Sequence, residues 1–185
     1  TEAYGSYDYV TTIGSFLVPL TTMLMEESMF RFLIDSKTKE QKETIISHTF
    51  LFSFLSGTVV SLIIGLLSWC FHYQLGYAIL IYTLSSLGVA LSNALSRGTG
   101  HIGLYSLSNF IGSFIIILLN LVLILGFHQG FFALITSVCV ANAAMAIFVL
   151  TKLRFWKHIN LKRYNKKELK KMLAYSVPLV PNTIS

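Results

Sequence analysis

The chain has 185 residues, of which 54% are hydrophobic and 12% are charged, with a net charge of +6. A soluble domain carries about 25% charged residues, so this composition, with a mean hydropathy of +0.68, argues against a soluble fold and points to lipid as the surrounding medium. The excess positive charge does not indicate nucleic-acid binding. The basic residues lie beside apolar segments, where anionic membrane lipids are the expected partner.

Apolar runs long enough to cross a membrane recur along the chain. A helix needs about 20 residues to cross a hydrocarbon core of about 30 Å, and its backbone must satisfy its own hydrogen bonds there. The sequence therefore predicts an all-α, polytopic transmembrane bundle with five complete spans and the start of a sixth near Tyr175. The five spans are Val10–Leu33, Ile45–Phe71, Tyr77–Leu95, Leu104–Phe127 and Phe131–Leu150.

The connections between these spans alternate in charge. All 14 Lys and Arg residues lie in or beside connections on one side of the membrane. The segments on the other side, 2–8, 72–76 and 128–130, carry none. Because basic connections stay in the cytoplasm, the pattern predicts residue 1 outside and residues 152–174 in the cytoplasm.

The first residue and the basic segment give two further expectations. Thr1 is predicted outside without a signal peptide before it, so we expect a longer protein with at least one helix upstream. Asn165 and Glu168 resemble a capping box, which would begin a short amphipathic helix with Met172 on its apolar face. That helix is expected at the cytoplasmic membrane surface. A basic linker between two helix bundles is an equally compatible interpretation.

A polar stripe follows the first predicted span. Its members recur every three or four positions, which places them on one face of a helix: Asp8, Thr12, Ser15, Pro19, Thr22 and Glu26. A polar face does not belong against lipid tails, so we expect it to face the bundle interior or a water-filled cavity. Pro19 lacks a backbone donor and should kink the helix. Glu27 is expected to pair with Arg31, four residues on, whereas Glu26 has no local partner and is a functional candidate.

Other polar side chains fall inside later spans. Asn93 and Arg97 lie on one face of the third span, Asn120 in the fourth and Asn142 in the fifth. They either form hydrogen bonds between helices or line a hydrophilic cavity. Small residues recur every four positions in the second, third and fifth spans, which is typical of close helix packing in lipid. No metal-ligand spacing, nucleotide loop or catalytic triad is present, so we expect no cofactor, metal site or enzymatic activity.

Several local patterns occur in a recognisable order. They are Tyr4-Gly5-Ser6-Tyr7 before the first span, Phe30-Arg31-Phe32-Leu33 at its end, Arg97-Gly98 with Gly100 after the third span, Gly130 before the fifth, and Ser176-Val177-Pro178-Leu179-Val180-Pro181-Asn182 after the basic segment. Over nearly all of the chain, this order resembles the bacterial polysaccharide transporter family. Its members are O-antigen and capsule repeat-unit flippases of the multidrug/oligosaccharidyl-lipid/polysaccharide exporter superfamily.

The resemblance implies two six-helix lobes in the bacterial cytoplasmic membrane. Residues 1–151 would form the first lobe without its first helix, residues 152–174 a basic cytoplasmic linker, and residues 175–185 the start of the second lobe. The substrate would be an undecaprenyl-pyrophosphate-linked oligosaccharide, moved through a cationic cavity with a proton or sodium ion as the coupling ion. Arg31 and Arg97 would be the residues that meet the pyrophosphate. Few basic residues lie at mid-depth here, so much of the cationic lining would lie elsewhere.

Two other functions remain open from the sequence. A drug/cation antiporter of the same superfamily needs an acidic residue at mid-depth, where this chain has mostly Ser, Thr and Asn. A membrane-embedded glycan polymerase or acyltransferase usually needs a large extracytoplasmic loop or a cytoplasmic catalytic motif, whereas the outer connections here are short. A structural scaffold would leave the polar stripe unexplained.

Overall fold

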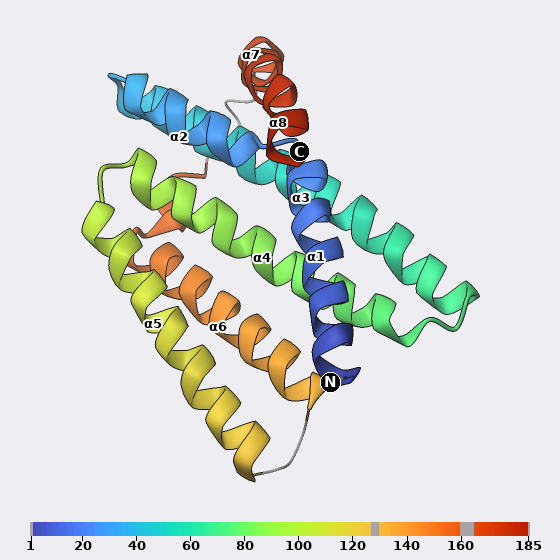
Figure 1. Cartoon of the computed structure of the whole chain (residues 1–185). Helices are drawn as coiled ribbons and strands as arrows, with labels where there is room; N and C mark the ends of the chain where they lie inside the picture. The colour runs from blue at the N-terminus through green and yellow to red at the C-terminus, as the bar shows by residue number, and fades with distance from the viewer. Residues whose placement is uncertain (1, 127–129, 160–164, 185) are drawn as a thin grey trace.

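A computed structural model describes residues 2–126, 130–159 and 165–184, and every regular element in these ranges is a helix (Figure 1). Four of the described helices are long and apolar enough to cross a membrane. They are α3 (Lys39–Cys70), α4 (Gln74–Gly98), α5 (Ile102–Asn120) with its π-helical continuation η1 (Leu121–Gly126), and α6 (Phe131–Lys152). They correspond to the second to fifth predicted spans, although Phe127, the predicted end of the fourth, lies outside the described residues.

The first predicted span is wrong as a single helix. The chain instead forms α1 (Glu2–Thr22) and α2 (Met25–Asp35), which run in different directions (Figure 1). Met23 and Leu24 between them both adopt left-handed backbone angles, with φ of 49° and 54°. The Leu24 N–H donates to the Thr22 hydroxyl at 3.2 Å instead of to a carbonyl of the preceding turn. The change of direction therefore comes four residues beyond Pro19, which lies within α1.

The break between α1 and α2 predicts an unusual response to glycine. A left-handed conformation costs a residue with a side chain about 1–2 kcal/mol, and the Met23 side chain is 44% exposed, so its loss removes little packing. We expect Met23→Gly to raise the free energy of unfolding by about 1 kcal/mol. Leu20→Gly, at a similarly exposed position within α1, should lower it by about the same amount. Thermal unfolding of both variants in detergent checks this, and a loss of stability in both would contradict it.

The helix α4 lies at the centre of the bundle. It contacts α1, α2, α3, α5 and α6, and α5 also packs along α6. Small residues allow these close approaches: a Cβ atom at Gly57 of α3 would lie 3.5 Å from Leu87 of α4, and one at Gly88 of α4 would lie 3.4 Å from Ala146 of α6. The predicted small-residue stripes are confirmed as packing surfaces.

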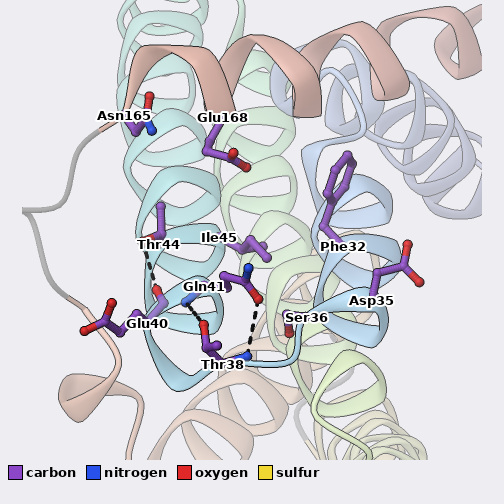
Figure 2. A pocket seen from close by; sticks show the side chains of 10 residues that line it. All are labelled: Phe32, Asp35, Ser36, Thr38, Glu40, Gln41, Thr44, Ile45, Asn165 and Glu168. Carbon is purple, nitrogen blue, oxygen red and sulfur yellow. Dashed lines mark hydrogen bonds between the residues drawn. The ribbon is translucent and has the colours of Figure 1, made fainter.

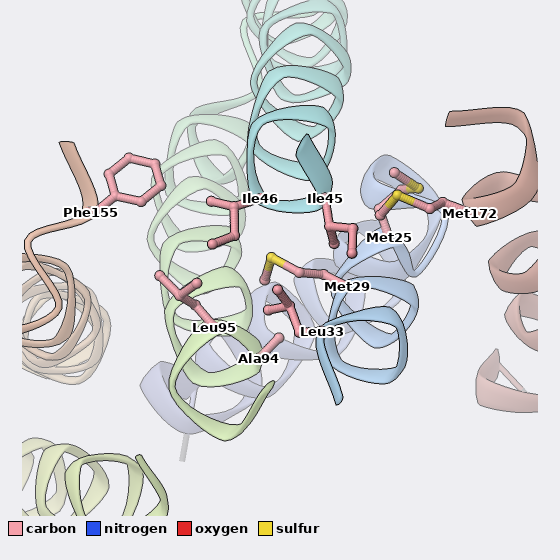
Figure 3. Close-up of a cluster of buried hydrophobic side chains, with 9 residues drawn as sticks. All are labelled: Met25, Met29, Leu33, Ile45, Ile46, Ala94, Leu95, Phe155 and Met172. Atoms are coloured by element: carbon pink, nitrogen blue, oxygen red, sulfur yellow. The ribbon is translucent and has the colours of Figure 1, made fainter. Parts of the chain in front are cut away.

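A hydrophobic cluster closes the end of the bundle at which α2, α3 and α4 meet (Figure 3). It joins α2, α3 and α4 to Phe155 in the short helix η2 (Phe155–Lys157) and to Met172 in α7 (Lys166–Ser176). Figure 3 shows Met172 beside Met25 of α2, and the Ser28 hydroxyl of α2 donates to the Met172 carbonyl at 3.1 Å. The amphipathic helix predicted after Asn165 is confirmed, but its apolar face packs on α2.

The start of α7 differs from the predicted capping box. The Asn165 side chain caps the helix by accepting from the Lys167 N–H at 3.0 Å. The Asn165 N–H donates to Nε2 of His48 in α3 at 2.9 Å, rather than to Glu168, which lies 3.5 Å from the Lys171 ammonium. The chain then continues through η4 (Val177–Leu179) into α8 (Val180–Ile184). Lys162 and Arg163 of the predicted basic linker lie outside the described residues.

Candidate functional site

One face of α1 is both polar and exposed. On its other side Gly14 is buried against the Tyr82 ring of α4, so the helix is anchored there. Asp8, Thr12 and Ser15 all lie on the exposed side. Large apolar side chains of α1, such as Phe16 and Leu20, are exposed beside them, whereas along most of α3 the exposed residues are all large and apolar, from Phe54 to Trp69. The Ser15 hydroxyl donates to the Thr12 carbonyl at 2.7 Å, so the Asp8 carboxylate is the group on this side that hydrocarbon would solvate least. We call Asp8, Thr12 and Ser15 the polar face of α1.

The rest of the predicted stripe is buried. Pro19 and Thr22 are covered at the end of α1, and Glu26 is 6% exposed in the first turn of α2. The expectation of one continuous face is wrong, because the break at Met23 and Leu24 gives α2 a different axis. The Glu26 Oε2 atom is buried and has no hydrogen-bond partner among the described residues. The N-terminus of α2 favours negative charge there, while burial in an apolar surrounding opposes it.

Two arginines lie beside aromatic rings near the end of α2. Arg97 of α4 pairs with Glu27 at 3.2 Å, so the predicted pairing of Glu27 with Arg31 is wrong. The Arg97 guanidinium also lies 4.7 Å from the centre of the Phe30 ring. Arg31 instead lies 4.9 Å from the centre of the Tyr175 ring, in α7. We call Glu27, Phe30, Arg31, Arg97 and Tyr175 the arginine site.

The arginine site borders a hollow of about 340 Å³ that Glu27, Phe30, Arg31 and Tyr175 help to line. Glu27 offsets part of the charge of Arg97, whereas Arg31 is exposed, lies against the Tyr175 ring and shares the hollow with the carboxylate of Asp35. A guanidinium offers a planar fork of donors that matches the oxygens of a phosphate. The arrangement can therefore bind an anion, with Arg31 as the more available cation.

The asparagines do not join this site. Asn142 of α6 donates to the hydroxyls of Ser85 and Ser86 in α4, at 3.4 and 3.3 Å, which is the packing role that the sequence left open. The side-chain oxygens of Asn93 and Asn120 are buried and accept no hydrogen bond from the described residues. The hydrogen bonds of the described residues do not connect any of the three to Glu26 or to the arginine site.

Another cavity lies between the end of α2 and the first turns of α3 and α7 (Figure 2). It encloses about 500 Å³ and carries the carboxylates of Asp35, Glu40 and Glu168. Glu40 and Glu168 stand in first turns, where a helix favours negative charge. Thr38 and Gln41 close a capping box at the same place (Figure 2). The favourable charge interaction with the helix N-termini therefore explains why Glu40 and Glu168 occur there. No three His, Cys, Asp or Glu side chains of the described residues could hold a metal ion.

Comparisons with protein-family models, with curated proteins and with solved structures find no match for this chain. The class that the fold itself defines is an all-helical protein with four helices suited to crossing a membrane. The resemblance to polysaccharide transporters rests on the local sequence patterns and stays a prediction.

Proposed function

We propose that the chain is part of a flippase that moves lipid-linked oligosaccharide repeat units across the bacterial cytoplasmic membrane for surface polysaccharide synthesis. The polar face of α1 carries this proposal. Asp8, Thr12 and Ser15 are exposed on a helix of 21 residues that packs against the membrane-crossing helix α4. Polar groups facing hydrocarbon are costly. A hydrophilic path along this side of α1 removes that cost, and a sugar chain can cross the membrane along it.

In this proposal α1 and α2 together form a broken fifth crossing, and residue 1 lies outside. The chain then supplies one lobe of a two-lobed transporter, and the path runs between the lobes. The basic ends of the helices, including Arg97 and the lysines of α7, face the cytoplasm.

The arginine site supports an anionic substrate. Arg31 lies in α2 and Arg97 in the last turn of α4, and in this proposal a lipid-linked sugar starts from them on the cytoplasmic side. Arg31 would bind an oxygen of the pyrophosphate, and Glu27 would hold Arg97 in place through their 3.2 Å ion pair. Tyr175 belongs to α7 and so links the arginine site to that helix. The buried Met172 of α7 also packs on α2.

Glu26 favours a second candidate, a drug/cation antiporter of the same superfamily. Its carboxyl group is nearly fully buried and one oxygen lacks a hydrogen-bond partner among the described residues. Such a carboxyl can take up and release a proton during a transport cycle. In the flippase the same group would carry the coupling proton. Deleting the gene separates the two functions: loss of surface glycan supports the flippase, and loss of drug resistance with intact glycan supports the antiporter.

Glu26→Gln tests the coupling role directly. The substitution keeps the size and polarity of the side chain but removes its ionisable proton. We therefore expect glycan export in cells to fall about tenfold or more, which corresponds to about 1.4 kcal/mol in barrier height. Glu43→Gln is the matched control, because that carboxylate is also largely covered, at 14% exposed, but it has a partner, the exposed Lys39, at 3.9 Å within α3. Normal export by Glu26→Gln at a normal protein level would remove Glu26 from the mechanism.

A further inference from the structure

A buried histidine joins the start of α7 to α3. His48 lies near the beginning of α3 and is 2% exposed. Its Nδ1 atom is 2.6 Å from the carbonyl oxygen of Thr44, one turn earlier in the same helix. Its Nε2 atom is 2.9 Å from the backbone nitrogen of Asn165, the residue that caps α7. The imidazole ring therefore connects two helices that are far apart in the sequence.

The two backbone groups assign the protonation state of the ring. A carbonyl oxygen only accepts hydrogen bonds, so Nδ1 carries a proton and donates it to Thr44. A backbone N–H only donates, so Nε2 is unprotonated and accepts from Asn165. Neither backbone group can reverse its role, as a hydroxyl group could. The contact between α3 and α7 thus requires a neutral ring with its proton on Nδ1.

Protonation of His48 is incompatible with this contact. An imidazolium carries a proton on both nitrogens, so the N–H groups of His48 and Asn165 would face each other as two donors. Nε2 also lies at the N-terminus of α7, where the dipole of this 11-residue helix has its positive end. Lys166 and Lys167 follow Asn165 in the first turn. A protonated ring would therefore repel the start of α7.

The cavity between α2, α3 and α7 adjoins this contact, because Thr44 and Asn165 both line it (Figure 2). The cavity carries one carboxylate from each of the three helices, namely Asp35, Glu40 and Glu168. Carboxylates favour a nearby imidazolium. Once His48 has lost Asn165, the open arrangement can thus hold a charged ring, whereas the closed arrangement opposes it.

Other ionisable groups lie on the elements that pack against α3. The Ser47 hydroxyl donates to the carbonyl of His158 at 3.5 Å, so the segment after η2 lies beside this part of α3. The helix α2 carries the buried Glu26. The charged side chain of α4 is Arg97, which pairs with Glu27. His158 and Glu26 are therefore the groups whose titration must be separated from that of His48.

We propose that His48 is a pH-sensitive switch that holds α7 against the bundle when it is neutral and releases α7 when it is protonated. Histidine is the side chain that ordinarily changes its charge between pH 5 and 8. The docked state excludes a proton that the released state accepts, so docking weakens as the pH falls. Release withdraws Tyr175 from the Arg31 guanidinium and uncovers Met172. This inference does not depend on the proposed transport function.

The exposure of α7 at different pH values tests the switch. The 185-residue chain is purified in detergent with Cys70→Ser and Cys139→Ala, and Met172→Cys supplies a thiol at a fully buried position. At each pH its rate of reaction with a maleimide is divided by that of Ala174→Cys, which is exposed on the same helix. This ratio cancels the pH dependence of the thiol itself. We expect the ratio to rise about tenfold from pH 8 to pH 5.5.

Three further variants identify the group that titrates. The side-chain oxygen of His48→Gln can accept from Asn165 and gains no proton in this range, so the ratio should stay low and constant within about twofold. Glu26→Gln and His158→Gln should keep the tenfold rise. A constant ratio in the chain with His48, or a rise that survives in His48→Gln, would overturn the switch. Loss of the rise in Glu26→Gln or His158→Gln would assign it to that group and overturn the switch as well.

A second probe covers the case in which Met172→Cys itself loosens the hydrophobic cluster. Ser176 of α7 is also fully buried, and Ser176→Cys changes a single side-chain atom. Its ratio to Ala174→Cys should show the same rise and the same loss of the rise in His48→Gln. Where the two probes differ, Ser176→Cys decides, and a constant ratio at this position would overturn the release of α7.

Discussion

Replacing Asp8, Thr12 and Ser15 together by leucine should abolish glycan export while the helix bundle still assembles. All three residues are exposed, and leucine favours helix formation. The variant therefore keeps the contacts of α1 with α4 but turns the hydrophilic path into an apolar wall. We expect export in cells to fall about a hundredfold, or about 2.7 kcal/mol in barrier height. Surface glycan, compared at equal protein levels in the membrane, is the measurement.

The helix α5 offers a matched control for the polar face of α1. Ser106 and Ser113 are also exposed polar residues, and unlike the polar face of α1 they include no carboxylate. The double variant Ser106→Leu with Ser113→Leu should export normally. Water access gives a second measurement: in a Cys70→Ser background, Ser15→Cys should react with a charged maleimide and Ser113→Cys should not. Normal export by the α1 triple variant, with an unreactive Ser15→Cys, would contradict a hydrophilic path along α1.

Gly14→Val should destabilise the bundle more than the same change elsewhere in α1. A Cβ atom at Gly14 would overlap ring atoms of Tyr82, so α1 and α4 would have to move apart. Overpacking of this kind costs about 1–3 kcal/mol, which corresponds to a fall in melting temperature of about 2–12 °C for a chain of this size. Thermal unfolding in detergent measures it.

Gly5→Val is the control for this substitution. It lies in the same helix, and no atom approaches within 4 Å of its Cβ position. Both variants place the same β-branched side chain in α1, so the intrinsic cost to the helix is shared and cancels in the comparison. Equal melting temperatures for the two variants would show that the approach of α1 to α4 at Gly14 does not limit stability.

The elements that the sequence predicts well are those set by local patterns. The apolar runs locate α3 to α6, and the Asn165 side chain marks the start of α7. The helix limits are less accurate. The Thr38–Gln41 capping box begins α3 at Lys39, six residues before the predicted Ile45, because hydropathy marks the membrane boundary and a helix extends beyond it through polar residues.

The parts that the sequence does not show depend on distant contacts. The apolar run continues through Met23 and Leu24 without a glycine, so nothing local signals two left-handed residues. Glu27 finds its partner in Arg97, 70 residues away, rather than in Arg31 on its own helix. The arginine site also needs Tyr175, which α7 brings to α2. Of the candidate site, the residue types were therefore predictable, but their grouping was not.

The central place of α4 has a consequence for biogenesis. Because it contacts five other helices, most of the interhelical surface of the bundle forms only after α4 has been synthesised. The ribosome delivers α1, α2 and α3 first, and a chain paused at that stage carries an exposed polar face and a glycine-lined seam with no neighbour to cover them. Release of α4 into the membrane lets α1, α2 and α3 pack on it, and its contacts with α5 and α6 follow when those helices arrive.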